Sequence, residues 1–384
     1  MRVLYIPNSP EIGGANRYLL TLWPHIQRHG VEPFAACPAP GPMADACREA
    51  GIPCAIVEPA QPEWDRPIES WRGFRRWRSI VGEIGPDVVH ANDFWNARSI
   101  APALAFSSAP LVCHVHFPVA PESIPWTFRH VRKPDLFVIN SHATHHELAG
   151  ALSQCCPVAR QQVVHNGVDL ARFEQRNRPF RDVPRVGIVA NLLPVKGHVD
   201  FLMMASLLQA RGVEAEYWIV GDDIHRVGYR EELERYSREL GLDGIVSFLG
   251  FRTDINDVLG ELDVLVSCSH QEPFGLSLVE AMACRLPVVA TRVGGIPEVV
   301  VHDRTGFLVP PHAPDVLAEA VHALVAQPDV RASMGDEGRR RVEQRFSAHG
   351  HAATISEAYR RLGRRAGRRQ TAILEAGQSR EPRR

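Results

Sequence analysis

Two carboxylates lie on either side of a predicted helix start in the segment Glu272-Pro-Phe-Gly-Leu-Ser-Leu-Val-Glu280. The apolar run 264–268 predicts a buried strand before it, and residues 277–284 are helical in pattern. The first N–H groups of a helix have no partner within the helix, and together with the helix dipole they stabilise an anion. The N–H groups expected at this anion site belong to Phe274, Gly275 and Leu276.

The two carboxylates indicate which groups, besides a phosphate, a ligand at this site would carry. A carboxylate repels a phosphate, but it is a good hydrogen-bond acceptor for hydroxyl groups. Glu272 and Glu280 would then accept from hydroxyls, one on a sugar and one on a ribose. The alternative is a solvated helix with incidental acidic residues, and the spacing alone does not separate the two interpretations.

A glycine pair, Gly13 and Gly14, lies between the predicted strand Arg2–Ile6 and the predicted helix 15–30. The third glycine of the dinucleotide-binding fingerprint is absent. A Gly-Gly turn between a strand and a helix is common in itself, so the pair alone is a weak indication of a phosphate-binding loop.

Two histidines flank Val115 at the end of the predicted strand 111–116. We expect His114 and His116 to point to opposite faces, so that one reaches a site and the other is a core residue. Opposite faces would prevent both from binding one metal ion, so the zinc pair, which is the alternative, is not favoured.

These residues are positioned by strands and helices that alternate along the chain, with an interruption at the polar stretch 169–184. Such alternation predicts parallel sheets with helices on both faces and a ligand at the strand carboxyl ends. The predicted fold class is α/β, with two Rossmann-like doubly wound domains facing a cleft. The further predicted elements are strands 88–90, 136–140, 185–190, 216–220, 245–249 and 287–290 and helices 68–84 and 141–152, the last capped by Ser141.

Composition excludes several classes of protein. The 384 residues suit two domains of ordinary size. The 43 Lys and Arg nearly balance the 44 Asp and Glu, so no nucleic-acid partner is expected. The eight Cys include no C-x-x-C pair, which argues against a disulfide framework or a zinc ribbon and favours reduced thiols in a cytosolic protein. The N-terminus lacks the features of a signal peptide, and no apolar run approaches the ~20 residues that span a bilayer.

The stretch Trp71-Arg-Gly-Phe-Arg-Arg-Trp-Arg78 is basic, aromatic and helical in period. Such a face can lie on anionic lipid, which would give a peripheral contact with the membrane. The interpretation we favour is a surface helix with Trp77, Ile80, Val81 and Ile84 packed inward.

Several segments resemble the retaining glycosyltransferases of family 4, which have the GT-B fold. The segment from Glu272 to Glu280 resembles the E-x7-E motif of that family. The similarity covers most of residues 1–346 and is strongest over 185–310. The other segments that carry it are 164–169 (VHNGVD), 287–298 (PVVATRVGGIPE) and 305–309 (TGFLV).

The resemblance implies roles for residues of the C-terminal half. Glu272 would bind donor-sugar hydroxyls, and Glu280 would bind the nucleotide ribose. Lys196 would meet the donor diphosphate, on which negative charge accumulates as the glycosidic bond breaks; an exposed loop lysine is the alternative. Many members have an Arg five residues before this Lys, whereas this chain has Asn191, which donates a hydrogen bond but carries no charge.

In the N-terminal half, the resemblance implies that the loop with Gly13 and Gly14 approaches the donor phosphates and the acceptor. It also identifies His116 as the catalytic-site histidine. The Asp-x-Asp motif of metal-dependent GT-A enzymes has no counterpart, and Asp222-Asp223 is interpreted as a loop near the nucleotide. We therefore expect no metal and no cofactor, with a nucleotide-diphosphate sugar as the donor substrate.

The resemblance also implies a domain organisation. We expect an acceptor domain over 1–172, a donor domain over 173–345 and a helix over 346–362 that packs back towards the N-terminal domain. The basic tail 363–384 has many charges and few apolar residues, which predicts disorder.

The predicted function is sugar transfer, with retention, from a UDP- or GDP-type donor to a hydroxyl of a glycan or lipid-linked acceptor. We expect the reaction to serve the synthesis of cell-surface glycan, glycolipid or polysaccharide. The expected location is the cytoplasm or the inner face of the membrane. The alternatives are a GT-B enzyme of the nucleotide-sugar 2-epimerase type and an inactive nucleotide-sugar-binding module. The sequence does not indicate an oligomeric state.

Overall fold

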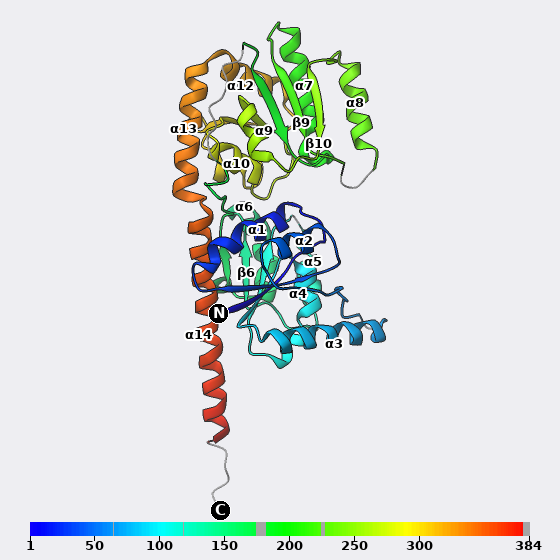
Figure 1. Cartoon of the computed structure of the whole chain (residues 1–384), viewed down its shortest axis with the longest axis vertical. Helices are drawn as coiled ribbons and strands as arrows, with labels where there is room; N and C mark the ends of the chain where they lie inside the picture. The colour runs from blue at the N-terminus through cyan, green and yellow to red at the C-terminus, as the bar shows by residue number, and fades with distance from the viewer. Residues whose placement is uncertain (64, 118, 174–181, 224–226, 379–384) are drawn as a thin grey trace, which may run out of the picture. The chain divides into compact units, whose positions relative to one another are not determined.

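The computed structural model describes residues 1–63, 65–117, 119–173, 182–223 and 227–378 (Figure 1). The chain forms two compact units. Unit 1 comprises Met1–Gly167 and Ala348–Arg384, and unit 2 comprises Val168–Ser347. Among the described residues, no helix is both long enough and apolar enough to pass through a bilayer.

Unit 1 is built on a seven-stranded parallel sheet with the order β3-β2-β1-β4-β5-β6-β7. The strand order reverses between β1 and β4, and in doubly wound sheets ligands bind at the strand carboxyl ends beside this point. The strands are β1 (Arg2–Ile6), β2 (Glu32–Cys37), β3 (Cys54–Ile56), β4 (Val88–Ala91), β5 (Leu111–Val115), β6 (Leu136–Ile139) and β7 (Gln161–Val163). The helices are α1 (Gly14–Gln27), α2 (Pro42–Glu49), α3 (Pro67–Ile84), α4 (Phe94–Ile100), α5 (Ser123–Thr127), α6 (His142–Cys155) and α14 (Ala348–Gln378), with short 3₁₀ helices η1 (Ala103–Phe106) and η2 (Val158–Arg160).

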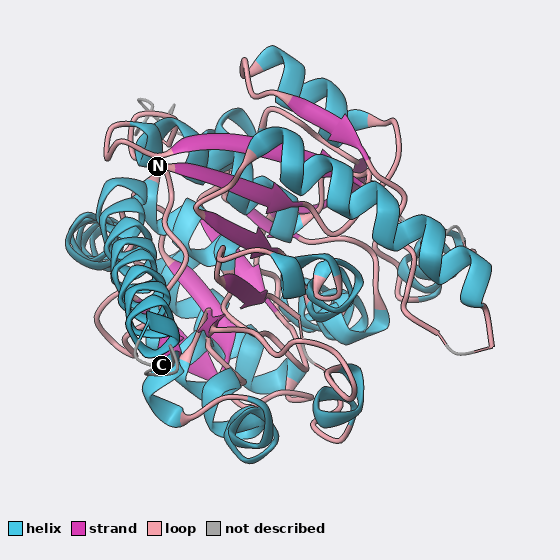
Figure 2. Ribbon diagram, turned by 90° about the horizontal axis from the view of Figure 1, so that it is seen from below, coloured by secondary structure: helices cyan, strands magenta, loops and turns pink. Residues whose placement is uncertain are grey.

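The core of unit 1 has two layers because side chains alternate along buried strands. On β1, Leu4 and Ile6 pack in the layer that contains α3, α4, α5 and α6. Val3 and Tyr5 pack in the layer that contains α1, α2 and α14. Helices therefore cover both faces of the sheet (Figure 2).

Helix α14 completes the second of these layers. Ile355 and Tyr359 are fully buried in it, and the Tyr359 hydroxyl lies 2.6 Å from His90 Nδ1. The helix continues to Gln378, so the expected disorder from residue 363 is wrong as far as residue 378. The reason is that Ala, Arg, Leu, Glu and Gln are strong helix formers, and no proline follows before Pro382. The rest of the expected tail, residues 379–384, lies outside the described residues.

Unit 2 is built on a six-stranded parallel sheet with the order β10-β9-β8-β11-β12-β13. The strands are β8 (Arg185–Val189), β9 (Glu216–Val220), β10 (Val246–Gly250), β11 (Val264–Ser267), β12 (Val288–Thr291) and β13 (Gly306–Val309). The helices are α7 (His198–Ala210), α8 (Tyr229–Glu239), α9 (Ile255–Glu261), α10 (Leu276–Ala283), α11 (Ile296–Val299), α12 (Pro314–Ala326) and α13 (Pro328–Arg345), with the 3₁₀ helix η3 (Pro194–Lys196).

The two faces of this second sheet are also both covered. Val186 and Ile188 pack in the layer of α7, α8 and α12. Leu265 and Ala290 pack in a separate layer, which contains α9, α10 and α13. Unit 2 is thus a second Rossmann-like sheet, which confirms the predicted α/β class with two doubly wound domains.

Candidate active site

The first part of the site is the turn that leads from β11 into α10. Gly275 precedes the helix with φ of 93°, a conformation that side chains other than glycine rarely adopt. Its N–H donates to Glu272 Oε1 at 3.2 Å. The Phe274 ring is buried and packs 5.8 Å from the Phe346 ring. Phe274 therefore contributes its ring to the core, and the function expected of it rests on its backbone N–H.

Lys196 comes to this turn from the end of η3. Its Nζ lies 2.7 Å from Glu272 Oε2, and both side chains are largely shielded from solvent. The loop approaches β11 closely, because a Cβ at Gly197 would lie 2.1 Å from the Cys268 carbonyl oxygen. The His270 N–H also donates to the Val195 carbonyl at 2.8 Å. The structure therefore brings Lys196, Glu272 and Gly275 together, although they come from two separate loops.

A second glycine pair fixes the backbone of Glu272 from the other side. A Cβ on Gly294 would lie 2.1 Å from the Glu272 carbonyl oxygen, and one on Gly295 would lie 2.3 Å from that of Pro273. The Gly295 N–H donates to the Glu272 carbonyl at 2.9 Å. Sequence reasoning did not include this pair among the site residues. The sequence feature that could have identified it is a Gly-Gly turn shortly after the strand β12.

Glu280 and Asn191 lie in different parts of unit 2. Glu280 is in the second turn of α10, is 4% exposed and interacts with neighbouring groups. A carboxylate tolerates such burial only when partners compensate its desolvation. Asn191 follows β8 and begins the turn that leads to Lys196, with its carbonyl accepting from the Leu193 N–H at 2.9 Å.

A group that sequence reasoning missed borders this site. His270 Nε2 lies 2.9 Å from Asp200 Oδ2, and the His270 ring lies 3.8 Å from the His312 ring. Asp200 is in the first turn of α7, so this contact links that helix to the loop that carries Glu272. The three residues are far apart in sequence, and no pattern indicated that they would meet.

Asp222 and Asp223 have structural partners. Asp223 Oδ2 accepts from the Tyr229 N–H at 3.0 Å at the start of α8. Asp222 Oδ1 lies 3.5 Å from Arg230 Nη1. These contacts tie both carboxylates to the first residues of α8.

In unit 1, His116 follows β5 and is 8% exposed. The Asn92 amide nitrogen donates to the Ala15 carbonyl at 2.8 Å, so the amide oxygen faces His116 Nε2, also at 2.8 Å. An oxygen in this position requires Nε2 to carry the proton, which leaves Nδ1 as the acceptor. Burial and, next, the charges of His90 and His351 hold the pKa of His116 well below its ordinary value. His116 is therefore a neutral imidazole of defined tautomer.

The expectation that His114 and His116 point to opposite faces is wrong. Their rings stack, with centroids 3.9 Å apart. The reason is that side chains alternate with a period of two, so residues i and i+2 share a face and Val115 alone points away. His114 is fully buried, with Nδ1 3.3 Å from His90 Nε2, and it is part of the core as expected.

The glycine turn of unit 1 leads directly into α1. Gly13 precedes the helix in an extended conformation, and Gly14 is its first residue. A Cβ at either position would meet no atom within 4 Å. The side chain of Asn16 fixes the preceding loop, since it donates to the carbonyls of Ser9 at 2.8 Å and Glu11 at 2.6 Å. The pair is thus an open turn next to the His116–Asn92–Ala15 chain of hydrogen bonds.

Comparison with known proteins places both units in one family. Residues 12–172 match Glycosyltransferase Family 4, and residues 171–341 match Glycosyl transferases group 1. A D-inositol 3-phosphate glycosyltransferase of Corynebacterium jeikeium is 31% identical over 250 residues, which are 60% of this chain and 58% of the relative. The match thus spans little more than half the length of that relative.

Solved structures share the fold. The Anabaena protein HepE, in complex with UDP and glucose, superposes with a TM-score of 0.80 at 24% identity, covering 93% of this chain and 99% of HepE. Sucrose-phosphate synthase from Thermosynechococcus elongatus superposes with a TM-score of 0.76 at 20% identity, covering 94% and 99%. These similarities, together with the two Rossmann-like units, establish the GT-B fold. The chain belongs to glycosyltransferase family 4.

Proposed function

We propose that this protein transfers a sugar from a nucleoside diphosphate sugar to an acceptor hydroxyl, with retention of configuration. The observation that carries the proposal is the contact between Lys196 and Glu272 at the start of α10. A cation and a hydroxyl acceptor stand there side by side, which suits a ligand with a diphosphate next to a sugar. A UDP sugar is the first donor to test, because HepE has been solved with UDP-glucose.

In the proposed reaction, the bond between the anomeric carbon and the diphosphate oxygen breaks, and the acceptor oxygen bonds to the same face of that carbon. The acceptor proton passes to an oxygen of the leaving phosphate. Lys196 stabilises the charge that develops on the diphosphate. Glu272 accepts hydrogen bonds from sugar hydroxyls and so orients the donor. Gly13, Gly14, Asn191, the N–H groups of Phe274, Gly275 and Leu276, and Glu280 are proposed to complete the donor site.

We assign His116 to the active site on the acceptor side. Its neutral state and its hydrogen bond to Asn92 leave Nδ1 able to accept a hydrogen bond from a hydroxyl. No metal or cofactor is part of the proposal, because Lys196 supplies the cation that the leaving group requires.

The experiment is a binding screen of nucleotide sugars, followed by NMR of the product formed with a panel of glycan and lipid-linked acceptors. Transfer with an unchanged anomeric configuration supports the proposal. Interconversion of the donor without an acceptor would indicate an epimerase instead. Donor binding without turnover on any acceptor would indicate a binding module.

We also propose that helix α3 makes a peripheral contact with anionic membrane. Trp77 and Val81 pack into unit 1, as expected for a surface helix. Ile68 and Trp71, on the same helix, are 66% and 60% exposed, and Phe106 nearby is 70% exposed. The exposed arginines of the helix, which would meet lipid phosphates, are Arg72, Arg75 and Arg76.

Sedimentation with vesicles tests this contact. The protein should sediment with phosphatidylglycerol vesicles and stay in solution with phosphatidylcholine vesicles. Trp71→Ser should weaken the sedimentation, whereas Val158→Ser, which replaces another exposed apolar residue of unit 1, should not. Equal sedimentation of Trp71→Ser and the unaltered protein would exclude a contact through α3.

A further inference from the structure

Three cysteines that are separated in the sequence meet at one edge of the unit 1 sheet. Cys37 ends β2, Cys47 lies in α2 and Cys54 begins β3. Cys37 Sγ lies 3.4 Å from Cys54 Sγ and 3.9 Å from Cys47 Sγ, and all three sulfurs lie within 4.8 Å of one another. Cys37 and Cys47 are fully buried, whereas Cys54 is exposed.

The sulfur spacing fits a single metal ion. A point equidistant from three sulfurs at these separations lies about 2.1 to 2.4 Å from each, which brackets the Zn–S bond length of about 2.3 Å. The thiols therefore need little movement to surround one ion. Thiolate sulfur is also the ligand that thiophilic ions such as Zn²⁺ and Cu⁺ prefer over oxygen.

The same spacing disfavours a disulfide between Cys37 and Cys54. In the register of β2 and β3, Cys54 pairs with Ala35, and Cys37 pairs with Ile56. The two cysteines are thus one strand apart and two residues out of step, which places their Cα atoms about 8 Å from each other. Disulfides usually need Cα atoms within about 6.8 Å, so the backbone would have to move. A metal ion needs only the sulfurs to be close.

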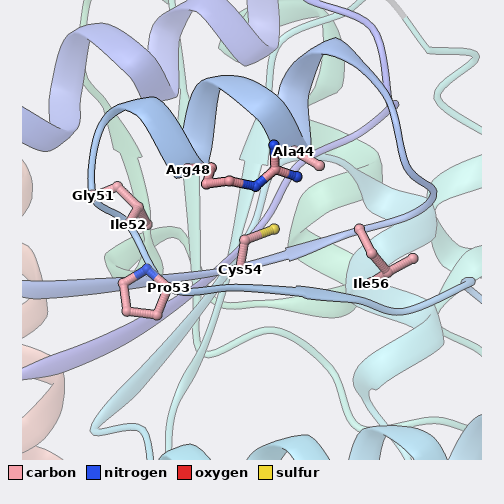
Figure 3. A pocket seen from close by; sticks show the side chains of 7 residues that line it. All are labelled: Ala44, Arg48, Gly51, Ile52, Pro53, Cys54 and Ile56. Carbon is pink, nitrogen blue, oxygen red and sulfur yellow. The ribbon is translucent and has the colours of Figure 1, made fainter.

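The surroundings of the three thiols allow an ion to enter. Cys54 also lines a pocket of about 400 Å³ together with Ala44, Arg48 and Ile56. Figure 3 shows its sulfur on the side of the strand where α2 and Arg48 lie. An ion can reach the two buried thiols past Cys54.

We propose that Cys37, Cys47 and Cys54 form a three-thiolate site for a thiophilic metal ion of the Zn²⁺ type. The site would tie the edge strand β3 and the helix α2 to β2. β3 has three residues and lies at the edge of the sheet, where β2 is its strand partner among the described residues. Binding of an ion to the folded unit alone stabilises that unit by mass action.

The test is titration of the reduced full-length protein with Zn²⁺ and, separately, with Cd²⁺ under argon. Native mass spectrometry should show one bound ion, and Cd²⁺ should produce the ultraviolet charge-transfer absorption of thiolate coordination. Zn²⁺ should raise the melting temperature. Cys54→Ala, at an exposed position, should fold normally and bind Zn²⁺ more than about 100-fold more weakly, because loss of a ligand costs more than loss of an outer-shell partner.

Cys155→Ala is the matched control, because Cys155 is a buried thiol of unit 1 whose sulfur lies 3.8 Å from the Ile124 carbonyl oxygen, outside the three-cysteine cluster. This variant should bind one ion with unchanged affinity. The proposal is overturned if the unaltered protein binds no ion, or if Cys54→Ala binds as tightly as it does. It is also overturned if protein purified without reductant and then denatured shows six free thiols instead of eight, with a disulfide mapped to this cluster.

Discussion

The ammonium nitrogen of Lys196 lies 2.7 Å from Oε2 of Glu272, although the two residues are 76 positions apart in the sequence. The Lys196 side chain is 22% exposed and that of Glu272 is 15% exposed, so the pair is partly desolvated. The ion pair thus places a cation and a hydrogen-bond acceptor next to each other at the start of α10. In the proposed donor complex, Lys196 would contact the diphosphate while Glu272 accepts hydrogen bonds from sugar hydroxyls.

Glu272→Gln is expected to lower kcat strongly, by about 100-fold or more, with little change in the Kd for the nucleoside diphosphate. The amide keeps the shape of the side chain but is a weaker acceptor for sugar hydroxyls. Nucleotide affinity should change little, because Glu272 is proposed to contact the sugar and not the diphosphate. Steady-state kinetics with the donor identified by the screen, and calorimetry with the diphosphate alone, measure the two effects. A variant that lost nucleotide affinity yet kept its kcat at saturation would contradict this role for Glu272.

Lys196→Ala is expected to reduce kcat by about 100- to 1,000-fold, by analogy with the loss of a transition-state donor, and to weaken diphosphate binding. Since Glu272 is then left partly buried without its cation, the stability of unit 2 should be checked by thermal melting. Lys196→Arg keeps the charge and serves as the control for stability. A near-normal kcat in Lys196→Ala would assign the leaving-group charge to another cation, such as the exposed Arg292.

Asn191→Arg introduces the charge that many family members have at this position. We expect it to leave activity intact or to tighten donor binding, because a second cation next to the diphosphate lowers the free energy of the bound donor. The measurement is the Kd for the diphosphate at two ionic strengths. A loss of donor binding without a loss of stability would show that the loop cannot accommodate the larger side chain.

Removal of metals with EDTA is expected to leave initial rates unchanged, since the proposed donor site uses Lys196 in place of a divalent ion. Cys54→Ala should be assayed in parallel, so that a lower stability caused by loss of the proposed thiolate site is recognised as such. Complete loss of activity that only Mn²⁺ or Mg²⁺ restores would exclude metal-free transfer.

The buried histidines of unit 1 predict a dependence of stability on pH. Burial lowers the pKa of His90 to about 3 and that of His351 to about 4. It also lowers the pKa values of His114 and His116 far below the ordinary value of 6.5. Between pH 6.5 and 4, the unfolded chain therefore binds protons that the folded unit does not, so stability is complete above pH 6.5 and is lost as the pH falls.

One carboxyl group of unit 1, that of Asp93, changes stability with pH in the opposite direction to the histidines. Burial raises the pKa of Asp93 to about 6, so this group favours the folded state at low pH. Each group changes the free energy of unfolding by at most about 1.4 kcal/mol per pH unit. The combined effect of four histidines is therefore larger than that of one carboxyl group. The free energy of unfolding can be measured by urea titration at pH 7.5, 6 and 5, with hydrogen exchange in peptides from β4 and α14 as the probe of unit 1. Its change with pH gives the slope.

His351→Gln isolates one of these groups. Glutamine can keep the contacts that His351 makes with the Tyr18 hydroxyl and the His165 carbonyl, but it does not titrate. The slope of unfolding free energy with pH should become shallower in this variant. An identical slope in both proteins would show that His351 is not protonated on unfolding.

Much of the fold could be predicted from hydrophobic runs. The strand predictions such as 88–90, 111–116 and 216–220 agree with β4, β5 and β9 to within one residue at each end, and Ser141 caps α6 as expected, accepting from Thr144 N–H at 3.1 Å. The strands β2, β3, β7 and β13 were not predicted. β3, β7 and β13 are short edge strands with fewer apolar neighbours to create a pattern. β2 contains Pro33 and two alanines, so its sequence does not form a clear apolar run.

The contacts within the candidate site could be predicted only in part. The motif around Glu272 and the position of Lys196 were visible in the sequence, but their ion pair depends on how Gly197, Gly294 and the β11 loop pack. The three-cysteine cluster was hidden because its members are ten and seven residues apart, unlike a C-x-x-C pair. Such contacts come from strand register and helix packing, which no local pattern encodes.

Helix α14 also has a consequence for biosynthesis. Its residues Ile355 and Tyr359 fill the second core layer of unit 1, yet they follow all of unit 2 in the chain. A ribosome therefore completes the whole of unit 2 before it supplies the helix that covers one face of the first sheet. During that interval the apolar side chains of Val3, Tyr5 and their neighbours lack part of their cover, so the nascent chain has to remain protected from aggregation until α14 emerges.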